Sequence, residues 1–269
     1  MRIPRCASLL LVLALCGLAP RAVLAASRTE LRVFAAASLT DVFTELAHTF
    51  EARHPGLAVQ LNFAGSQQLV AQLEQGAGAD VLASADERTM DYARDHGLIA
   101  GASRPFARNR LVLIVPKSNP GHIGRLQDLQ RTGIKFVTAI AGVPVGHYTR
   151  EVLSNLSHVN GFDANYRERV LANVVSEEEN VKAIVARVQL GEADAGFVYR
   201  SDVTPAVAKV VRMIEIPDEA NAIALYPIAV LAHASRPPDA QAFVDLVLSK
   251  EGQRALATRG FMPVSAGAP

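Results

Sequence analysis

The sequence predicts an α/β protein of two lobes, each built on a mainly parallel sheet flanked by helices. Short apolar segments alternate with segments of helical spacing along most of the chain, which favours parallel strands joined by right-handed helical crossovers. Roughly eight predicted strands exceed the about five or six strands of a typical sheet. No long linker separates the units, so we expect strands to pass directly between the two lobes.

The N-terminal residues predict an export signal. Basic residues precede an apolar run over residues 7–18, and small residues suited to signal-peptidase cleavage follow at Ala25 and Ala26. We therefore expect residues 1–25 to be a signal peptide and the mature protein to be periplasmic. Lipid attachment at Cys16 is the alternative, although the leucine before this cysteine is bulkier than the small residue that such sites favour.

Composition excludes several classes of function. The 269 residues carry 27 basic and 26 acidic side chains, so bulk charge does not indicate a protein that binds nucleic acid. After the leader, no segment approaches the ~20 unbroken apolar residues of a membrane-spanning helix. Both cysteines lie in the leader, so we expect a mature protein without disulfides or thiolate metal sites. We also expect a monomer without a cofactor.

The first strand-turn-helix unit spans residues 31–50. A continuous apolar strand over 33–37 changes to helical spacing at Leu39, and Ser38 stands at the junction. The hydroxyl of Ser38 could cap the helix, helped by Asp41, or it could face an anion held by the first helical turn. Taken alone, the position favours capping.

Two similar units follow. Residues 59–63 alternate in polarity as a half-buried strand does, and Ser66 opens a helix that ends at Gly76. Residues 80–84 predict a third strand, and a helix over 86–95 comes after it.

The middle of the chain repeats the pattern. Residues 111–116 predict a fully apolar strand, and residues 134–140 predict another that leads through a Gly/Pro turn into a helix over 147–156. Residues 157–175 have no clear periodicity, and we assign them no element.

The last third of the chain completes the predicted architecture. We interpret the acidic run 177–179 as a solvated lead-in to the helix after Asn180, where it complements the helix dipole. A strand over 225–232 contains Pro227, which favours an edge or crossing position over the centre of a sheet. The remaining predicted elements are a buried strand over 193–199 and helices over 239–248 and 251–258.

Helix-start turns are the recurring feature that could carry function. The seven histidines show no metal-ligand spacing, and no serine lies in a G-x-S-x-G nucleophile elbow. Turns that open helices recur instead, at Ser38, Ser66, Val145 and Val181. Each alone is a capping or turn signal. Four together, at the carboxyl ends of strands in an open α/β sheet, are where such folds bind ligands.

Several motifs resemble those of the periplasmic molybdate-binding proteins of ABC importers. The resemblance covers nearly the whole mature chain, and the motifs occur in the family's order. They are FAAASLTDVF, FAGSQQL, ADVLASAD, GVPVGHYTREVL, ENVKAIVARVQLGEADAGFVYRSDV and RGFMPV. It implies a two-lobed periplasmic-binding-protein fold of the second type, which closes on its ligand like a hinge. We expect residues 26–108 with 227–269 to form lobe 1, and residues 109–226 to form lobe 2.

The resemblance also implies the ligand and the residues that bind it. Ser38 and Ser66 would each offer a hydroxyl and a backbone N–H, Val145 and Val181 a backbone N–H each, and Tyr199 a phenolic hydroxyl. The ligand would be molybdate, and also tungstate, delivered to the membrane subunits of an ABC permease. No metal cation is implied, because molybdenum is bound as an oxyanion. Molybdate has acceptor lone pairs only, so a site of donors alone is complementary to it.

Two departures from the family and two alternative functions stay open at this point. Many family members have alanine in place of Val145 and serine or threonine in place of Gln67, and the second difference leaves fewer hydroxyls near the site. Sulfate has the same charge and acceptor pattern, so only cavity size could exclude it. An exported enzyme on the same scaffold is the less favoured alternative, because a fold does not determine function.

Overall fold

The strands of the protein form one connected sheet system of two halves. The computed structural model describes residues 29–264. The strands are β1 (Thr29–Ala36), β2 (Leu57–Ala64), β3 (Val81–Ala83), β4 (Arg104–Pro116), β5 (Phe136–Ala139), β6 (Val174–Glu178), β7 (Ala195–Tyr199), β8 (Val211–Glu215) and β9 (Ile223–Val230). The spatial order is β2-β1-β3-β9-β4-β7-β5-β6, with β8 also beside β4.

Helices follow most of these strands. The α-helices are α1 (Thr40–Arg53), α2 (Ser66–Glu74), α3 (Glu87–Asp95), α4 (Pro144–Leu156), α5 (Tyr166–Leu171), α6 (Val181–Gln189), α7 (Pro237–Leu248) and α8 (Lys250–Thr258). The short 3-10 turns are η1 (Ala37–Leu39), η2 (Leu126–Gln130), η3 (Arg200–Asp202) and η4 (Val207–Lys209). Among residues 29–264, no helix is both long and apolar enough to cross a membrane.

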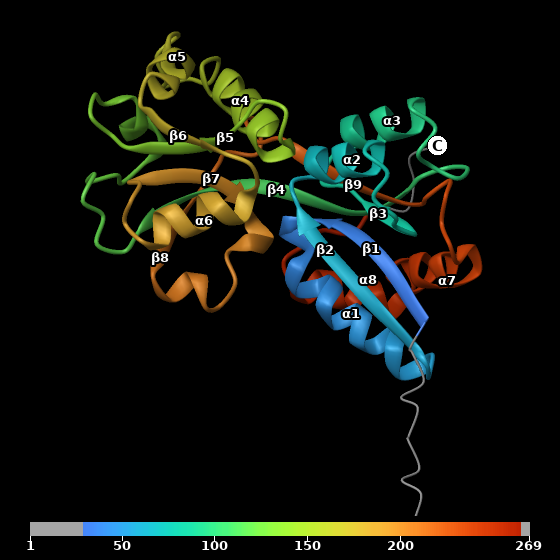
Figure 1. The fold of residues 1–269 in the computed structure, drawn as a ribbon. Helices are drawn as coiled ribbons and strands as arrows, with labels where there is room; N and C mark the ends of the chain where they lie inside the picture. The colour runs from blue at the N-terminus through green and yellow to red at the C-terminus, as the bar shows by residue number, and fades with distance from the viewer. Residues whose placement is uncertain (1–28, 265–269) are drawn as a thin grey trace, which may run out of the picture.

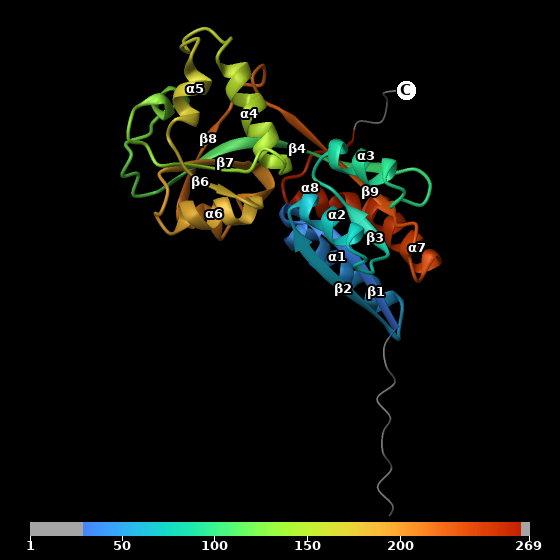
Figure 2. The same ribbon diagram turned by 45° about the horizontal axis from the view of Figure 1, so that its top comes forward.

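Figure 1 shows two lobes that are connected through β4 and β9. Helices α1, α2, α3, α7 and α8 lie around the sheet of β1–β3, and α4, α5 and α6 lie around the sheet of β5–β8; Figure 2 shows the same division from another side. Strand β4 takes part in both halves, because residues 104–110 pair with β9 and residues 111–116 pair with β7 and β8. The predicted lobe boundaries fall inside β4 and β9, and the division at those residues stays a prediction.

The parallel strands lie where the predicted strand-turn-helix units place them. β1 pairs in parallel with β2 and β3, and β5 pairs in parallel with β6 and β7. The long strands β4 and β9 pair antiparallel with their neighbours. The carboxyl ends of β1, β2, β5 and β6 each lead into a helix, so four helix starts are available for a site.

Aromatic packing fixes α1 against the rest of lobe 1. Phe43 lies 5.8 Å from Phe106 of β4 and 5.9 Å from Phe243 of α7, measured between ring centroids. Phe50, two turns later, lies 5.5 Å from Phe243. The predicted helical spacing therefore corresponds to a buried face, and this face positions the junction between β1 and α1.

The prediction of a helix lead-in over the acidic run 177–179 is wrong for Glu177 and Glu178, which lie in a strand. Strand β6 runs to Glu178, and a short helix, α5, occupies part of the region to which no element was assigned. Glu177 forms an ion pair with Arg150 of α4, and Glu178 accepts a hydrogen bond at 3.0 Å from Nε of Arg187 in α6. Arginines of α4 and α6 thus balance the negative charge of β6. The local sequence pattern of these residues does not indicate a strand.

Pro227 lies on a strand that crosses between the lobes, although the strand is not an edge. β9 lies between β3 and β4 in the sheet, and Pro227 is opposite Pro105 where the register between β4 and β9 shifts. A missing N–H is tolerated at such an irregularity. The carbonyl of Pro227 accepts a hydrogen bond from the Ser84 N–H at 2.9 Å. The predicted signal peptide and Cys16 lie outside the described residues.

Candidate functional site

The five predicted site residues lie around one cavity between the two lobes. Ser38, Ser66, Val145, Val181 and Tyr199 all line it. The other lining residues are Ala36, Ala37, Ala64, Gly65, Ala85, Val143, Pro144 and Asn180. The structure therefore brings all five predicted positions together, while their binding role stays a prediction.

Four of the five positions lie in first turns of helices. Ser38 is in η1, which continues directly into α1, and Ser66 is the first residue of α2. Val145 is the second residue of α4, and Val181 is the first residue of α6. Backbone N–H groups at such positions have no acceptor in their own helix. Helix starts from both lobes thus supply donors and the positive ends of helix dipoles around the cavity.

The interpretation of Ser38 as a helix cap is wrong. The N-cap of α1 is Leu39, and no side chain caps this helix. The Ser38 hydroxyl lies 3.0 Å from the hydroxyl of Tyr226 in β9. Asp41, which was expected to assist capping, has its carboxylate 3.3 Å from Nζ of Lys182. Ser38 is therefore free of a capping role and is oriented by a tyrosine instead.

The hydroxyl oxygen of Ser66 already accepts one hydrogen bond within the protein. Its Oγ accepts a hydrogen bond from the Ala85 N–H at 3.0 Å, and the residue is buried. The capping contact of α2 is made instead by Gln68, whose side chain accepts from the Gly65 N–H at 3.1 Å. The Ser66 proton is not needed in either contact, so it can be donated into the cavity.

Tyr199 ends β7 with its side chain buried against the cavity. Within residues 29–264, its hydroxyl is one of the few buried polar atoms without a hydrogen-bond partner. Burial raises the pKa of Tyr199 well above its usual value, so the hydroxyl keeps its proton at neutral pH. A buried donor without a partner is costly in a folded protein, so this hydroxyl is available to donate to a group held in the cavity.

The cavity suits a small anion. Its volume of about 20 Å³ is far below the ~300–1,000 Å³ of sites for drug-sized ligands. None of the described residues that line it has a charged side chain. A ligand held here would interact with hydroxyls, backbone N–H groups and helix dipoles, which together favour a compact negative group. Among residues 29–264, no cluster of histidine, cysteine, aspartate and glutamate side chains could hold a metal ion.

The two lobes touch directly beside the cavity. Gln68 of α2 donates to a carboxylate oxygen of Glu179 at 2.7 Å, and Gln67 donates to the Glu179 carbonyl at 3.1 Å. Lys182 of α6 reaches Asp41 of α1. The structure is therefore a closed form. Gln67, which differs from the family pattern, contributes to contact between the lobes.

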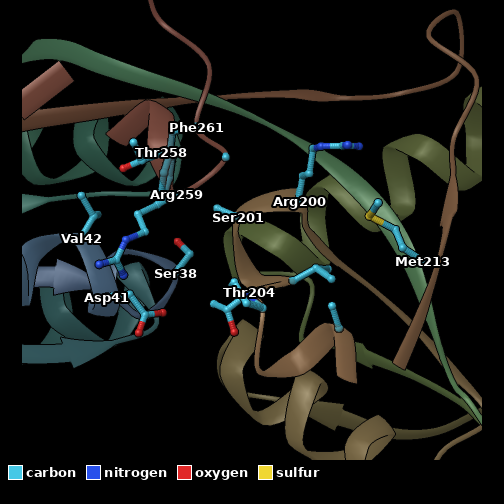
Figure 3. A pocket seen from close by; sticks show the side chains of 14 residues that line it. Ser38, Asp41, Val42, Arg200, Ser201, Thr204, Met213, Thr258, Arg259 and Phe261 are labelled. Carbon is cyan, nitrogen blue, oxygen red and sulfur yellow. The ribbon is translucent and has the colours of Figure 1, made fainter. Parts of the chain in front are cut away.

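A larger cavity of about 600 Å³ adjoins the site, and Figure 3 shows the side chains that line it. Of the five predicted residues, only Ser38 reaches it. Its two guanidinium groups have carboxylate partners, since Arg200 pairs with Glu215 and Arg259 pairs with Glu45. Unlike the smaller cavity, this one has charged side chains in its lining, among them Asp41.

Tyr226 and Ala85 contact the site serines but were not predicted from the sequence. Tyr226 is the one hydroxyl-bearing residue in the apolar run 225–232, and a lone hydroxyl in a buried strand needs a polar partner. That signal was available, although it could not identify Ser38 as the partner. Ala85 contributes a backbone N–H, for which its side chain gives no signal.

Comparison with known proteins gives a match over most of the chain. A family model described as bacterial extracellular solute-binding protein matches residues 31–262. The molybdate-binding protein ModA of Mycobacterium bovis is 40% identical over 229 residues, which cover 85% of this chain and 83% of that protein.

Two solved structures share the fold at low sequence identity. The periplasmic molybdate-binding protein of Azotobacter vinelandii has a TM-score of 0.73 and 21% identity, covering 87% of this chain and 100% of that one. The sulfate-binding protein of Mycobacterium tuberculosis has a TM-score of 0.77 and 18% identity, covering 88% of each chain. The predicted two-lobed fold of type II periplasmic binding proteins is thus confirmed, and the likeness at this level concerns the fold alone.

Proposed function

The chain belongs to the bacterial extracellular solute-binding proteins, and on that premise we propose that it captures molybdate between its lobes and delivers it to the membrane subunits of an ABC importer. The single observation that carries the proposal is the cavity lined by four helix starts and Tyr199, where none of the described lining residues has a charged side chain. The proposal places the mature protein in the periplasm after removal of residues 1–25. In the alternative, the exported protein is attached to the membrane by a lipid at Cys16.

The donor inventory of the cavity supports an oxyanion without protons. Ser38, Ser66 and Tyr199 supply three hydroxyls, and the helix starts at Ser38, Ser66, Val145 and Val181 supply four backbone N–H groups. Every oxygen of molybdate is an acceptor, so all of these donors can be used. Charge-assisted hydrogen bonds of this kind are about twice as strong as neutral ones. A dianion can therefore be held without a cationic side chain.

The same donor inventory disfavours anions that carry a proton. Hydrogen phosphate carries a proton that needs an acceptor, and leaving a buried polar group unpaired costs ~1–3 kcal/mol. Tungstate has the charge and shape of molybdate, so we expect it to bind similarly. Sulfate has shorter bonds and the same acceptors, and its exclusion depends on the fit of the cavity. The fold alone does not distinguish molybdate from sulfate, because solved relatives named for each share it.

Binding is coupled to closure of the lobes in this proposal. Ser38 and Ser66 follow β1 and β2 of one lobe, and Val145 and Val181 follow β5 and β6 of the other. A ligand that contacts both pairs binds the closed form better than the open one, and it shifts the population accordingly. The closed form is the one that the permease subunits would receive.

Calorimetric titration of ligand-free protein tests the proposal. We expect saturable binding of molybdate and tungstate at micromolar protein, weaker binding of sulfate, and the weakest binding of phosphate. No heat with molybdate would overturn the proposal, and tighter binding of sulfate would identify the protein as a sulfate receptor. The proposal includes no catalysis and no cofactor. Chemical conversion of any of these anions by the protein would support the enzyme alternative instead.

A further inference from the structure

Tyr226 lies directly behind Ser38, outside the lining of the cavity. It is fully buried on β9, and its hydroxyl is 3.0 Å from the Ser38 Oγ. Its ring is held by edge contacts to Tyr199 and Phe261, at centroid distances of 5.7 Å and 5.5 Å. The ring is therefore held in place, and its hydroxyl stays beside the Ser38 hydroxyl.

The direction of this hydrogen bond follows from the ligand. A serine hydroxyl has one proton and can also accept. If the Ser38 proton is donated to an anion that only accepts, the bond between Ser38 and Tyr226 must be donated by Tyr226. Burial raises the pKa of Tyr226 well above its usual value, so the phenol keeps the proton that this requires.

The other site serine has the same arrangement. Ser66 Oγ accepts from the Ala85 N–H, a group that can only donate. Its proton is thereby left for the cavity. Two serines from neighbouring helix starts are each held from behind by a donor, one from the backbone and one from a side chain. Of these two donors, only Tyr226 can be changed by substitution without altering the main chain.

We propose that Tyr226 is a positioning residue that donates to Ser38 Oγ, directs the Ser38 proton into the cavity and so selects oxyanions without protons. The inference rests on the proposed function, since it requires an anion in this cavity. Without the Tyr226 hydroxyl, Ser38 could turn a lone pair toward the cavity and accept a hydrogen bond from a protonated anion. Tyr226 thus acts on specificity through Ser38 and does not touch the ligand.

A double-mutant cycle with Tyr226→Phe and Ser38→Ala tests this assignment. The cycle measures binding of molybdate and of inorganic phosphate by calorimetry at neutral pH. Tyr226→Phe keeps the ring contacts, and we expect it to weaken molybdate binding about 3- to 10-fold, the range of one net hydrogen bond. In the Ser38→Ala background the same change should have less than about a 2-fold effect, because the hydroxyl through which it acts is absent.

A second readout separates positioning from packing. The ratio of molybdate to phosphate affinity should fall in Tyr226→Phe, because phosphate gains an acceptor where molybdate loses a donor. Tyr166→Phe is the matched control. It removes a buried tyrosine hydroxyl that donates to the Leu126 carbonyl away from the cavity, and it should change neither affinity nor ratio. Thermal unfolding of each variant checks that the fold is retained.

The outcomes distinguish the two levels of the argument. If the wild type binds molybdate and Tyr226→Phe binds it with the same affinity, the inference about Tyr226 is overturned and the proposed function is not. An equal loss in both backgrounds, with a constant affinity ratio, would also overturn it and assign Tyr226 a packing role. Absence of molybdate binding by the wild type would overturn the proposed function, and the inference with it.

Discussion

Lys182 Nζ lies 3.3 Å from Asp41 Oδ2, and this ion pair joins the two lobes next to the cavity. Lys182 directly follows Val181, and Asp41 lies one turn after Ser38. The pair therefore connects the helix starts that supply donors from opposite sides. Both side chains are partly exposed, so the contact is a modest stabiliser of the closed form and not a fixed clamp.

Removing this contact should weaken binding through closure. We expect Asp41→Asn to lower molybdate affinity about 2- to 5-fold, since exposed ion pairs contribute ~0.2–1 kcal/mol. The loss should shrink at high salt, which already screens the pair. Asp245→Asn removes the same charge from an exposed pair with Arg104 within lobe 1, and it should have no effect. Titrations at low and high salt measure both, and an equal loss in the control would contradict the assignment.

Gly65 provides a sharper test of closure. A Cβ at this position would lie 2.4 Å from the Glu179 carbonyl oxygen of the opposite lobe. The φ of Gly65 is −61°, a value that alanine adopts without strain. We therefore expect Gly65→Ala to fold normally but to bind molybdate at least about 5-fold more weakly, the effect of ~1–3 kcal/mol of overpacking in the closed form only.

X-ray scattering with and without molybdate measures this effect on shape. The wild type should become more compact with ligand, and Gly65→Ala should stay at its ligand-free dimensions. Gly142→Ala is the control, because a Cβ there meets no atom within 4 Å. Dimensions of the wild type that are identical with and without ligand would count against hinge closure altogether.

Ser66 and Tyr199 should differ in their effect on the ligand-free protein. Ser66→Ala leaves the buried Ala85 N–H without its acceptor, so we expect a loss of ~1–3 kcal/mol in the free energy of unfolding. Tyr199→Phe removes a hydroxyl that has no hydrogen-bond partner within residues 29–264, so ligand-free stability should be unchanged or higher. Both should weaken molybdate binding, by ~1.5–3 kcal/mol for a hydrogen bond to a charged group.

Urea unfolding of both variants and calorimetry with molybdate give the two quantities. Ser154→Ala, an α4 substitution away from the cavity, serves as a control for loss of a serine hydroxyl. Equal destabilisation of the ligand-free protein by Ser66→Ala and Tyr199→Phe would show that Tyr199 has a structural partner. Wild-type affinity in both would show that neither hydroxyl binds the anion.

The burial of Asp202 predicts an unusual dependence of folding stability on pH. This buried carboxylate accepts a hydrogen bond from the Tyr199 N–H at 3.2 Å, and its other oxygen lies 3.5 Å from Lys182 Nζ. Burial raises the pKa of Asp202 from 3.8 to about 6, although Lys182 acts to lower it. The folded protein then holds this proton more tightly than the unfolded chain does. The contribution of Asp202 to stability is therefore largest below pH 3.8 and falls as pH rises through about 6.

Replacing Asp202 with asparagine should remove that decline. Between pH 4 and pH 7 we expect the free energy of unfolding of Asp202→Asn to rise relative to the wild type, by on the order of 1–3 kcal/mol. Urea titrations across this range measure the difference. The control Asp245→Asn should keep the profile of the wild type. Parallel profiles for Asp202→Asn and the wild type would mean that Asp202 titrates alike in the folded and unfolded states.

Local patterns predicted the elements whose stability is local. The switch from apolar strand to helical spacing at Leu39 placed β1 and α1 correctly, because one buried face determines each element. β6 was missed because its glutamates are stabilised by arginines of α4 and α6, which no local pattern connects to it. The convergence of Ser38, Ser66, Val145, Val181 and Tyr199 was expected from the family resemblance, since periodicity does not reveal which turns meet. The contact of Ser38 with Tyr226, 188 residues away, depends on the fold and was missed.

The position of β9 in the sheet determines when the sheet can be completed as the chain is made. β9 lies between β3 and β4, although both of those strands are made long before it. The sheet carrying Ser38 and Ser66 is therefore incomplete until the chain has been made to Val230. In contrast, β5 can pair with β6 and β7, and β4 with β7 and β8, before then. Because Tyr226 is on β9, the strand that finishes the sheet also supplies the Ser38 contact. A chain that stops short of it would lack both together.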